Sequence, residues 1–255
     1  MYVARSRRAG GLSLGVDLTP QGHCSFSCVY CQATHPTVRD SRLHVELDVL
    51  RTGLVDTLAS AQAPELRDLV FAGSGEPTAA PNFGDAVDVI LDVCQTARFD
   101  RPRRIFTNGR HLDQPHVCAA LERWIDAAGE VWVKLDGATD ATLEAVNGRK
   151  LDAAKHLEGI WQLAQRRELG IQTLLIEGEG LASAESIAEE VIEAVATGLA
   201  RGARVKEAHL LTLARIPSDP EQAERLRAIS DERLESIAQR MRERTGLTVT
   251  VYGAY

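Results

Sequence analysis

The sequence predicts an α/β protein built on a parallel sheet. Short apolar runs of strand length alternate with longer stretches of helical periodicity, in six successive strand–helix units. Strict alternation of this kind favours parallel strands joined by right-handed crossovers. The length of 255 residues is normal for a single α/β barrel. Periodicity alone fits a doubly wound sheet and a partial barrel equally well.

Each predicted strand is a short apolar run, and each predicted helix is a longer stretch in which apolar residues recur at helical spacing. In chain order, the predicted strands are 12–18, 68–72, 103–107, 131–136, 171–176 and 206–211. The helices that follow them are predicted at 45–60, 83–97, 115–128, 152–168, 184–202 and 231–245. A last apolar run, 247–251, closes the chain. We expect a single domain over residues 1–255.

Composition and charge narrow the class of protein. Hydrophobic residues make up 44% and charged residues 25% of the chain, as in globular proteins with a full core. The net charge of −7 argues against a broad nucleic-acid-binding surface, although a local basic patch is compatible with it. No apolar run is long enough to cross a bilayer, and the basic start of the chain makes a poor signal peptide. We therefore expect a cytoplasmic protein without a membrane partner.

Two loops stand out by their length or composition. About 25 residues, 19–44, separate the first strand from its helix, where a loop of this kind commonly has 2–6 residues. A loop this long in a compact domain is usually functional, and this one contains three clustered cysteines. The segment 215–224 is rich in Pro, Asp and Glu and is predicted to be a second, mobile loop.

The three clustered cysteines, Cys24, Cys28 and Cys31, form a CxxxCxxC pattern. An odd total of five cysteines, three of them within eight residues, is atypical of a secreted disulfide framework. Thiolates are the soft ligands that iron–sulfur clusters require, and three of them leave one iron of a cubane open for a substrate. The alternative is a zinc site completed by His23, although zinc sites usually contain CxxC pairs.

A CxxxCxxC motif after a first strand, with an aromatic residue just before the last cysteine, resembles the radical S-adenosylmethionine (SAM) superfamily. Tyr30 occupies the aromatic position. The resemblance implies a partial (β/α)6 TIM-like barrel of the radical SAM type, a [4Fe–4S] cluster on Cys24, Cys28 and Cys31, and SAM bound to its open iron. It also implies reductive cleavage of SAM to a 5′-deoxyadenosyl radical that removes hydrogen from a substrate, with Tyr30 near the adenine.

The end of the second predicted strand, Phe71 to Thr78, resembles the "GGE" or "GEP" element of the same family. In that element the backbone and the glutamate receive the SAM amino group. The resemblance therefore implies that Gly73, Gly75 and Glu76 bind SAM, and glycine permits close approach of a backbone to a ligand. The alternative is a plain turn with a capping threonine.

The third and fourth strand ends supply further candidates. Thr107 and Asn108 begin a "TNG" sequence that lines the SAM pocket in the family. Lys134 and Asp136 share one strand face, and burying both costs several kcal/mol unless they meet polar partners. The resemblance implies that they contact the SAM carboxylate and ribose. The alternative is a structural Lys–Asp ion pair.

The later motifs are similar to a subfamily of compact iron–sulfur oxidoreductases related to the tRNA wyosine-forming enzyme. They are the segments 147–149, 171–178 and 211–217. The chain departs from the subfamily's "INRP" and "TxxRPP" sequences, and it lacks the extra N-terminal cysteines of a second cluster. Cys94 and Cys118 lie in predicted helices, where we expect buried structural thiols and no auxiliary cluster.

The substrate is the least determined part of the prediction. Candidate contacts, taken from residues that would face the barrel, are Asp17, Gln172, Glu177, His209 and Arg215. Each also fits a satisfied polar residue at a strand end. We favour a small-molecule substrate, with RNA- or peptide-modifying activity and a non-catalytic Fe–S or zinc scaffold as alternatives. The family implies a flavodoxin or ferredoxin as electron donor, and a homo-oligomer is compatible with the sequence.

Overall fold

The computed structural model describes residues 1–6, 8–19, 22–33 and 44–254. Its contacts divide the chain into two compact units, each formed from several segments. The first comprises Met1–Ser25, His35–Thr107 and Asp113–Val131. The second comprises Phe26–Thr34, Asn108–Leu112 and Trp132–Tyr255. The two units therefore share the long loop that carries the cysteines: Cys24 belongs to the first, and Cys28 and Cys31 belong to the second.

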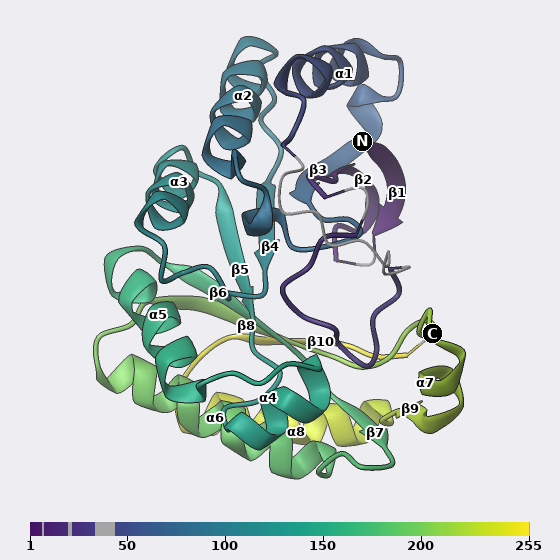
Figure 1. The fold of residues 1–255 in the computed structure, drawn as a ribbon, viewed down its shortest axis with the longest axis vertical. Helices are drawn as coiled ribbons and strands as arrows, with labels where there is room; N and C mark the ends of the chain where they lie inside the picture. Colours follow the sequence, from purple (N-terminus) through teal and green to yellow (C-terminus); the bar gives the residue numbers. More distant parts are fainter. Residues whose placement is uncertain (7, 20–21, 34–43, 255) are drawn as a thin grey trace. The chain divides into compact units, whose positions relative to one another are not determined.

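The first unit holds strands β1 (Tyr2–Ser6), β2 (Gly11–Val16), β3 (Leu66–Phe71) and β4 (Arg103–Thr107), adjacent in that order (Figure 1). The strands β2, β3 and β4 are parallel, while β1 pairs with β2 in the antiparallel direction. Its helices are α1 (Leu47–Ala59), α2 (Phe83–Thr96) and α3 (Pro115–Asp126), with the short 3-10 helices η1 (Ala63–Glu65) and η2 (Pro77–Ala79).

The second unit contains strands β6 (Leu169–Leu174), β8 (Val205–Leu211) and β10 (Val249–Tyr252), together with the last three residues of β5 (Glu130–Lys134). All the pairings among these strands are parallel. A separate antiparallel ribbon joins β7 (Ile176–Gly178) to β9 (Leu226–Ala228). The helices are α4 (Asp140–Asn147), α5 (Ala153–Arg166), α6 (Ala184–Ala200), α7 (Pro220–Arg225) and α8 (Asp231–Thr245).

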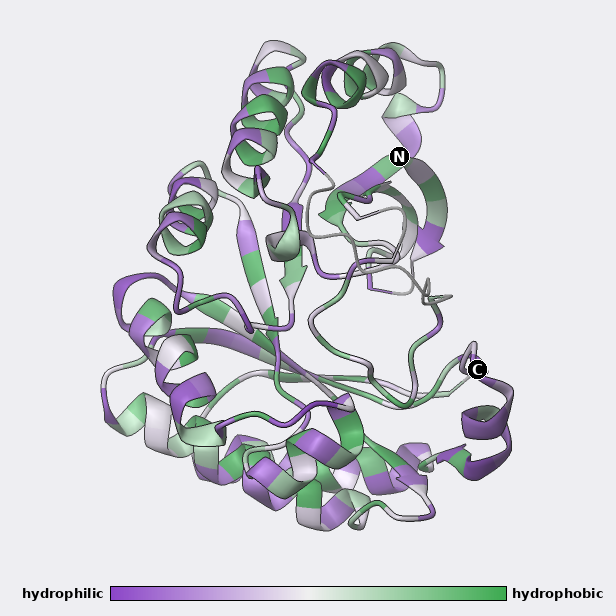
Figure 2. Ribbon diagram, viewed as in Figure 1, coloured by the Kyte–Doolittle hydropathy of each residue, from purple (hydrophilic) through white to green (hydrophobic). Residues whose placement is uncertain are grey.

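The helices of the second unit start where the local sequence supplies a capping side chain. The side chains of Thr139, Asp152, Ser183 and Ser230 each accept a hydrogen bond from the backbone N–H three residues later. Figure 2 shows hydrophobic and hydrophilic residues interleaved along the long helices, as expected of helices with one buried and one exposed face.

The predicted elements agree with the structure. All six predicted strands and all six predicted helices are present, and the last apolar run forms β10; none of their ends differs by more than two residues. The strand β1, the helix α4 and the β7–β9 ribbon were not predicted, because each is short and lacks a long periodic pattern. The predicted loop 215–224 contains most of α7, so half of it is helical. Residues 20–21 and 34–43 of the predicted loop 19–44 lie outside the described residues.

Among the described residues, no helix is both long and apolar enough to span a membrane. Cys94 and Cys118 are buried in α2 and α3, which confirms their predicted burial.

Candidate active site around Cys28

The segment around Cys28 is fastened to the C-terminal end of α4. The backbone N–H of Ser27 donates to the carbonyl of Asn147 at 2.9 Å, and that of Val29 donates to the carbonyl of Val146 at 3.0 Å. The helix ends at Gly148, which adopts the left-handed conformation with φ of +64°. A Cβ atom there would lie 2.3 Å from the Ser27 carbonyl oxygen. Gly148 therefore ends the helix and leaves room for the cysteine segment.

Two nitrogen donors lie against the Cys28 sulfur. Lys134 Nζ, at the end of β5, is 3.4 Å from Cys28 Sγ, and Asn147 Nδ2, at the end of α4, is 3.6 Å away. The Lys134 ammonium also lies 5.2 Å from the ring centres of Phe26 and Tyr30. Lys134 is one of the predicted site residues, whereas Asn147 is not, because no helix was expected at α4.

Asp136 is the centre of this cluster, and only 1% of it is exposed. Its Oδ2 forms an ion pair with Lys134 Nζ at 2.5 Å and accepts hydrogen bonds from the Tyr30 hydroxyl and from Asn147 Nδ2. Its Oδ1 accepts from the backbone N–H of Leu174 at 2.9 Å. A buried carboxylate needs such partners to remain charged. The Lys–Asp ion pair, considered above as a structural alternative, is therefore present.

The electrostatics favour charged Lys134 and neutral Tyr30. Burial alone would lower the pKa of Lys134, but Asp136 and Cys28 outweigh it, so this pKa lies above its usual value. Burial, together with Asp136 and Cys28, raises the pKa of Tyr30 well above its usual value. Tyr30 therefore stays protonated, and its hydroxyl donates a hydrogen bond to Asp136. Burial also raises the pKa of the Cys31 thiol, but a coordinating metal ion deprotonates a thiol outright.

In the first unit, Glu76 is buried at the start of η2. Its Oε1 accepts hydrogen bonds from the Thr78 backbone N–H at 3.1 Å, the Thr78 hydroxyl at 2.6 Å and the Thr107 hydroxyl at 2.6 Å. Its own backbone N–H donates to the carbonyl of His23 at 3.0 Å. The capping turn considered as an alternative is thus part of the geometry, and it joins Glu76 to the residue just before Cys24.

The glycines beside Glu76 are required by the protein's own packing. A Cβ on Gly73 would lie 2.1 Å from Asp17 Cγ, and one on Gly75 would lie 2.1 Å from the His23 carbonyl oxygen. Gly73 and Gly75 therefore leave room for Asp17 and His23. Asp17 in turn accepts hydrogen bonds from the Ser74 N–H at 3.0 Å and the Ser74 hydroxyl at 2.9 Å. Its carboxylate holds the Gly73–Glu76 turn in place.

Gln172 and His209 lie in one row with Lys134. Lys134 pairs with Gln172, and Gln172 pairs with His209, in adjacent parallel strands, so their side chains share one face of the sheet. The His209 ring stacks on Trp132 with centroids 3.8 Å apart and meets Tyr252 edge-on at 5.0 Å. The structure therefore brings two of the predicted substrate residues together with Lys134.

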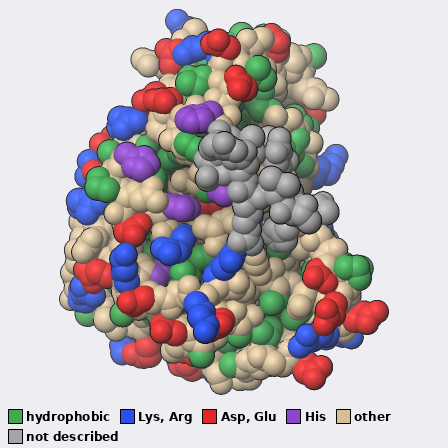
Figure 3. Space-filling view, in the orientation of Figure 1, with side chains coloured by type: hydrophobic (Ala, Val, Ile, Leu, Met, Phe, Trp, Pro, Cys, Tyr) green, Lys and Arg blue, Asp and Glu red, His purple; other side chains and the backbone are tan. Residues whose placement is uncertain are grey.

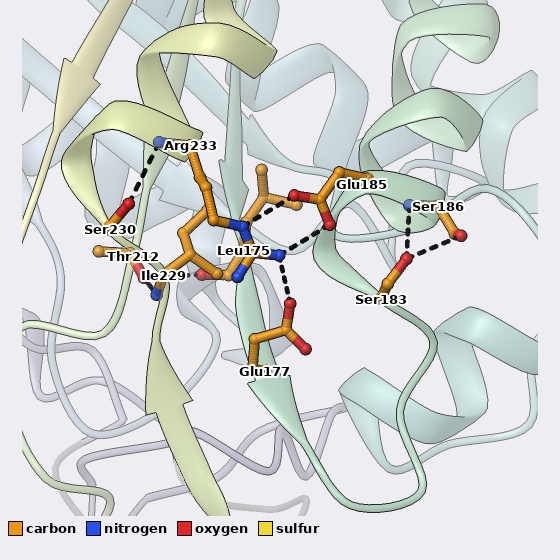
Figure 4. Close-up of polar contacts among 9 residues, drawn as sticks. All are labelled: Leu175, Glu177, Ser183, Glu185, Ser186, Thr212, Ile229, Ser230 and Arg233. Carbon is orange, nitrogen blue, oxygen red and sulfur yellow. Dashed lines mark hydrogen bonds and ion pairs between the residues drawn. The ribbon is translucent and has the colours of Figure 1, made fainter.

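Glu177 has a different environment. It lies on β7, and its carboxylate pairs with Arg233 of α8 at 2.6 Å, while Glu185 of α6 binds the same guanidinium (Figure 4). Figure 4 also shows that the Thr212 hydroxyl donates to the Leu175 carbonyl at 2.9 Å and accepts from the Ile229 N–H at 2.9 Å. The ion pairs of Arg233 therefore join the β7–β9 ribbon to α8 and α8 to α6.

Arg215 belongs to a segment that is joined to the residues after Cys31. Its carbonyl accepts from Gln32 Nε2 at 3.4 Å, and its side chain is exposed. The Ser218 backbone N–H donates to the Cys31 carbonyl at 2.9 Å. No pattern in the sequence indicates the link between Ser218 and Cys31.

Asn108 is buried, and its side-chain oxygen accepts from the Arg110 N–H at 3.0 Å, as in a turn.

The residues present fit an iron–sulfur cluster and SAM. None of the three motif cysteines is in a disulfide, and three thiols are the donor set that such a cluster requires. Asn147 Oδ1 is buried and accepts no hydrogen bond among the described residues, so a hydroxyl or ammonium of a bound ligand would satisfy it. Within the described parts of the chain, no three His, Cys, Asp or Glu side chains converge as a preformed metal site.

Comparison with known proteins identifies the family. The model of the radical SAM superfamily matches residues 18–191 of this chain, which include all three clustered cysteines and the Lys134–Asp136 pair. The chain belongs to the radical SAM superfamily. The cofactors of this superfamily are a [4Fe–4S] cluster and SAM.

Among curated proteins, the chain is similar to a UPF0026 protein of Synechocystis sp., with 29% identity over 175 residues. The match covers 66% of this chain and 61% of the Synechocystis protein. Among solved structures, it resembles a radical SAM methyltransferase from Sphaerobacter thermophilus with a TM-score of 0.62, 18% identity, and coverage of 98% of this chain and 68% of that one.

A second solved structure, native anSMEcpe with bound AdoMet, gives a TM-score of 0.57 and 14% identity, covering 94% of this chain and 63% of that one. At such identities these two structures show the fold alone. They confirm the α/β, partial-barrel fold class of the radical SAM type that the resemblance of the motifs implied.

Proposed function

We propose that this radical SAM enzyme binds one [4Fe–4S] cluster through Cys24, Cys28 and Cys31, and uses SAM to act on a small-molecule substrate. When bound together, the cluster and SAM supply a 5′-deoxyadenosyl radical, which abstracts a hydrogen atom from the substrate. The ligation by all three cysteines is supported by their spacing in the chain. The residues proposed to contact the substrate are Gln172, His209 and Arg215.

The observation that carries the proposal is that Lys134 and Asn147 donate to the Cys28 sulfur and that Asp136 holds both of them. The Tyr30 hydroxyl donates to the same carboxylate. A partly buried lysine and a buried carboxylate next to a candidate iron ligand are costly for a protein that merely uses the fold as a scaffold. Lys134 supplies a positive charge for a carboxylate group such as that of SAM. Asp136 and Asn147 Oδ1 supply acceptors for hydroxyl groups such as those of its ribose.

In the first unit, Gly73, Gly75, Glu76 and Thr107 are proposed to bind the amino end of SAM. Asp17 holds their turn through Ser74, and the Glu76 N–H ties it to His23. Since Asp17 is engaged in this way, its proposed part is to position the turn. Asn108 is proposed to complete the SAM-binding set from the adjacent turn. Each of these residues acts by binding or orienting.

A small substrate is favoured by charge. The net charge is −7, and on the face shown in Figure 3 the described Lys and Arg side chains are interspersed with Asp and Glu. Phosphate backbones bind clustered cations. Gln172 and His209, in the row that starts at Lys134, are the proposed substrate contacts, with Arg215 at the segment joined to Cys31.

The proposed electron donor is a flavodoxin or ferredoxin. None of the five cysteines, all of them described residues, is in a disulfide, which supports a reducing compartment and the proposed cytoplasmic location.

The test is anaerobic reconstitution followed by addition of dithionite and SAM. Iron, sulfide and 5′-deoxyadenosine are then quantified for the wild type, for Cys28→Ala, and for Cys94→Ala as a matched control. We expect deoxyadenosine from the wild type and the Cys94 variant only. About one zinc per chain, without sulfide or SAM cleavage, would contradict the proposal.

A further inference from the structure

Two side-chain nitrogen donors are directed at the sulfur of Cys28. Lys134 Nζ lies 3.4 Å and Asn147 Nδ2 3.6 Å from this atom. Both donors come from element ends, β5 and α4, and both are held there by Asp136. Their contact with the sulfur is therefore part of a built arrangement.

Hydrogen bonds to cluster sulfurs and local net charge both set the reduction potential of an iron–sulfur cluster. A donor that approaches a ligand sulfur stabilises the added negative charge of the reduced cluster, and a charged donor does so more strongly than a neutral one. Lys134 is a charged donor with 19% of its side chain exposed, and Asn147 is a neutral donor that is 1% exposed. Water therefore screens neither contact strongly.

We propose that Lys134 and Asn147 raise the reduction potential of the cluster by donating to the sulfur of its ligand Cys28. This rests on the proposed function, since it requires Cys28 to be a cluster ligand. The assignment gives Lys134 a role in the absence of SAM, in addition to any contact with the SAM carboxylate. It gives Asn147 a role as a positioning and tuning residue.

The effect of the charge of Lys134 on the reduction potential has to be separated from the effect of its contact with the Cys28 sulfur. The variant Lys134→Met leaves Asp136 as an uncompensated negative charge, which by itself disfavours reduction. The double variant Lys134→Met with Asp136→Asn removes one charge of each sign and leaves the net charge unchanged. The variant Asn147→Leu replaces a neutral donor with an apolar side chain of similar size, so the charge stays the same. Lys206→Met, on the exposed side of β8, is the matched control for loss of a lysine.

The experiment uses the full chain, reconstituted anaerobically without SAM, and measures iron, sulfide and the midpoint potential in a titration followed by electron paramagnetic resonance. At the wild-type midpoint, we expect the ratio of reduced to oxidised cluster to fall at least tenfold in the double variant, which corresponds to about 59 mV for one electron. Asn147→Leu should shift it in the same direction by less, and Lys206→Met should leave it unchanged.

The outcomes are distinguishable. Full iron and sulfide in Asn147→Leu and in the double variant, with the wild-type potential in both, would overturn the inference and leave the proposed function intact. A wild-type protein that holds no iron and no sulfide would instead contradict the proposed function, and the inference with it. Should the double variant fail to load iron, the potential of Asn147→Leu still decides.

Discussion

Gly148 makes room for the carbonyl oxygen of Ser27, since a Cβ at this glycine would lie only 2.3 Å from that atom. The same glycine ends α4 in the left-handed conformation. Two constraints therefore act on one residue, and the second of them concerns the chain segment that carries Cys28.

Gly148→Ala should lower both the free energy of unfolding and the iron content. The left-handed backbone costs an alanine about 1–2 kcal/mol, and the clash with Ser27 adds to this and displaces Cys28. Gly246 is the matched control, because it ends α8 in the same conformation with no atom within 4 Å of its Cβ position. Urea denaturation and iron analysis of both variants would measure the difference. Equal losses in the two variants would show that the Ser27 contact has no effect.

His156 should make the stability depend on pH. Burial, followed by the charges of Lys134 and Arg110, lowers the pKa of His156 to about 4. This pKa is lower than that of an unfolded histidine, so protonation of this residue favours the unfolded chain. The contribution of neutral His156 to the free energy of unfolding is therefore complete above about pH 6.5 and is lost as the pH falls toward 4. The loss amounts to about 3 kcal/mol over that interval.

The measurement for His156 is urea denaturation between pH 7.5 and 4, compared with His156→Gln. The variant cannot titrate at this position, so the wild type should lose more stability than the variant on acidification. Parallel pH profiles for the two proteins would contradict the prediction.

Arg104→Met should destabilise the protein by about 3–5 kcal/mol, because it leaves the Asp68 carboxylate buried without its cation. Arg104 pairs with Asp68 at 2.6 Å and with Glu130 at 2.8 Å, and only 2% of the Asp68 side chain is exposed. Arg123→Met is the control, since its partner Asp88 is exposed, and it should cost about 0–1 kcal/mol. Thermal or urea denaturation would compare the two, and a similar small loss in both would rule out the buried pair as a major contribution.

Asp17→Ala should weaken SAM binding about tenfold or more, because hydrogen bonds to a charged group contribute about 1.5–3 kcal/mol and the Gly73–Glu76 turn loses its anchor at Ser74. Calorimetry of SAM binding to the reconstituted protein, without substrate, would measure the effect. Asp92→Ala, which removes an exposed partner of Arg51, should bind SAM like the wild type. Unchanged SAM binding in Asp17→Ala would favour the earlier expectation of a substrate contact.

Much of the fold could be predicted because its elements are long and periodic. The helices α2, α5 and α8 have strong apolar periodicity, and the parallel strands alternate with them. The elements that were missed have other causes. The strand β1 is mostly exposed, and the β7–β9 ribbon has only three residues a strand, so its pairing depends on tertiary contacts.

The candidate site, like the fold, could be predicted only in part. Local spacing determined the grouping of Cys24, Cys28 and Cys31 and the shared face of Lys134 and Asp136, because both depend on neighbours in the chain. Which of these residues bind the cofactors stays a prediction. Side chains with no distinctive pattern, such as Asn147 and Ser218, received no assignment.

The sequence by itself determined the alternation of strands and helices, since this depends on periodicity, and the resemblance of its motifs implied the family. Only the tertiary structure decided that Asn147 and Lys134 meet at Cys28, that Asp17 holds the Ser74 turn, and that Glu177 pairs with Arg233. The physical reason is that hydrogen bonds and ion pairs between residues far apart in the chain depend on distances of a few ångströms, which the fold sets and a sequence pattern does not encode.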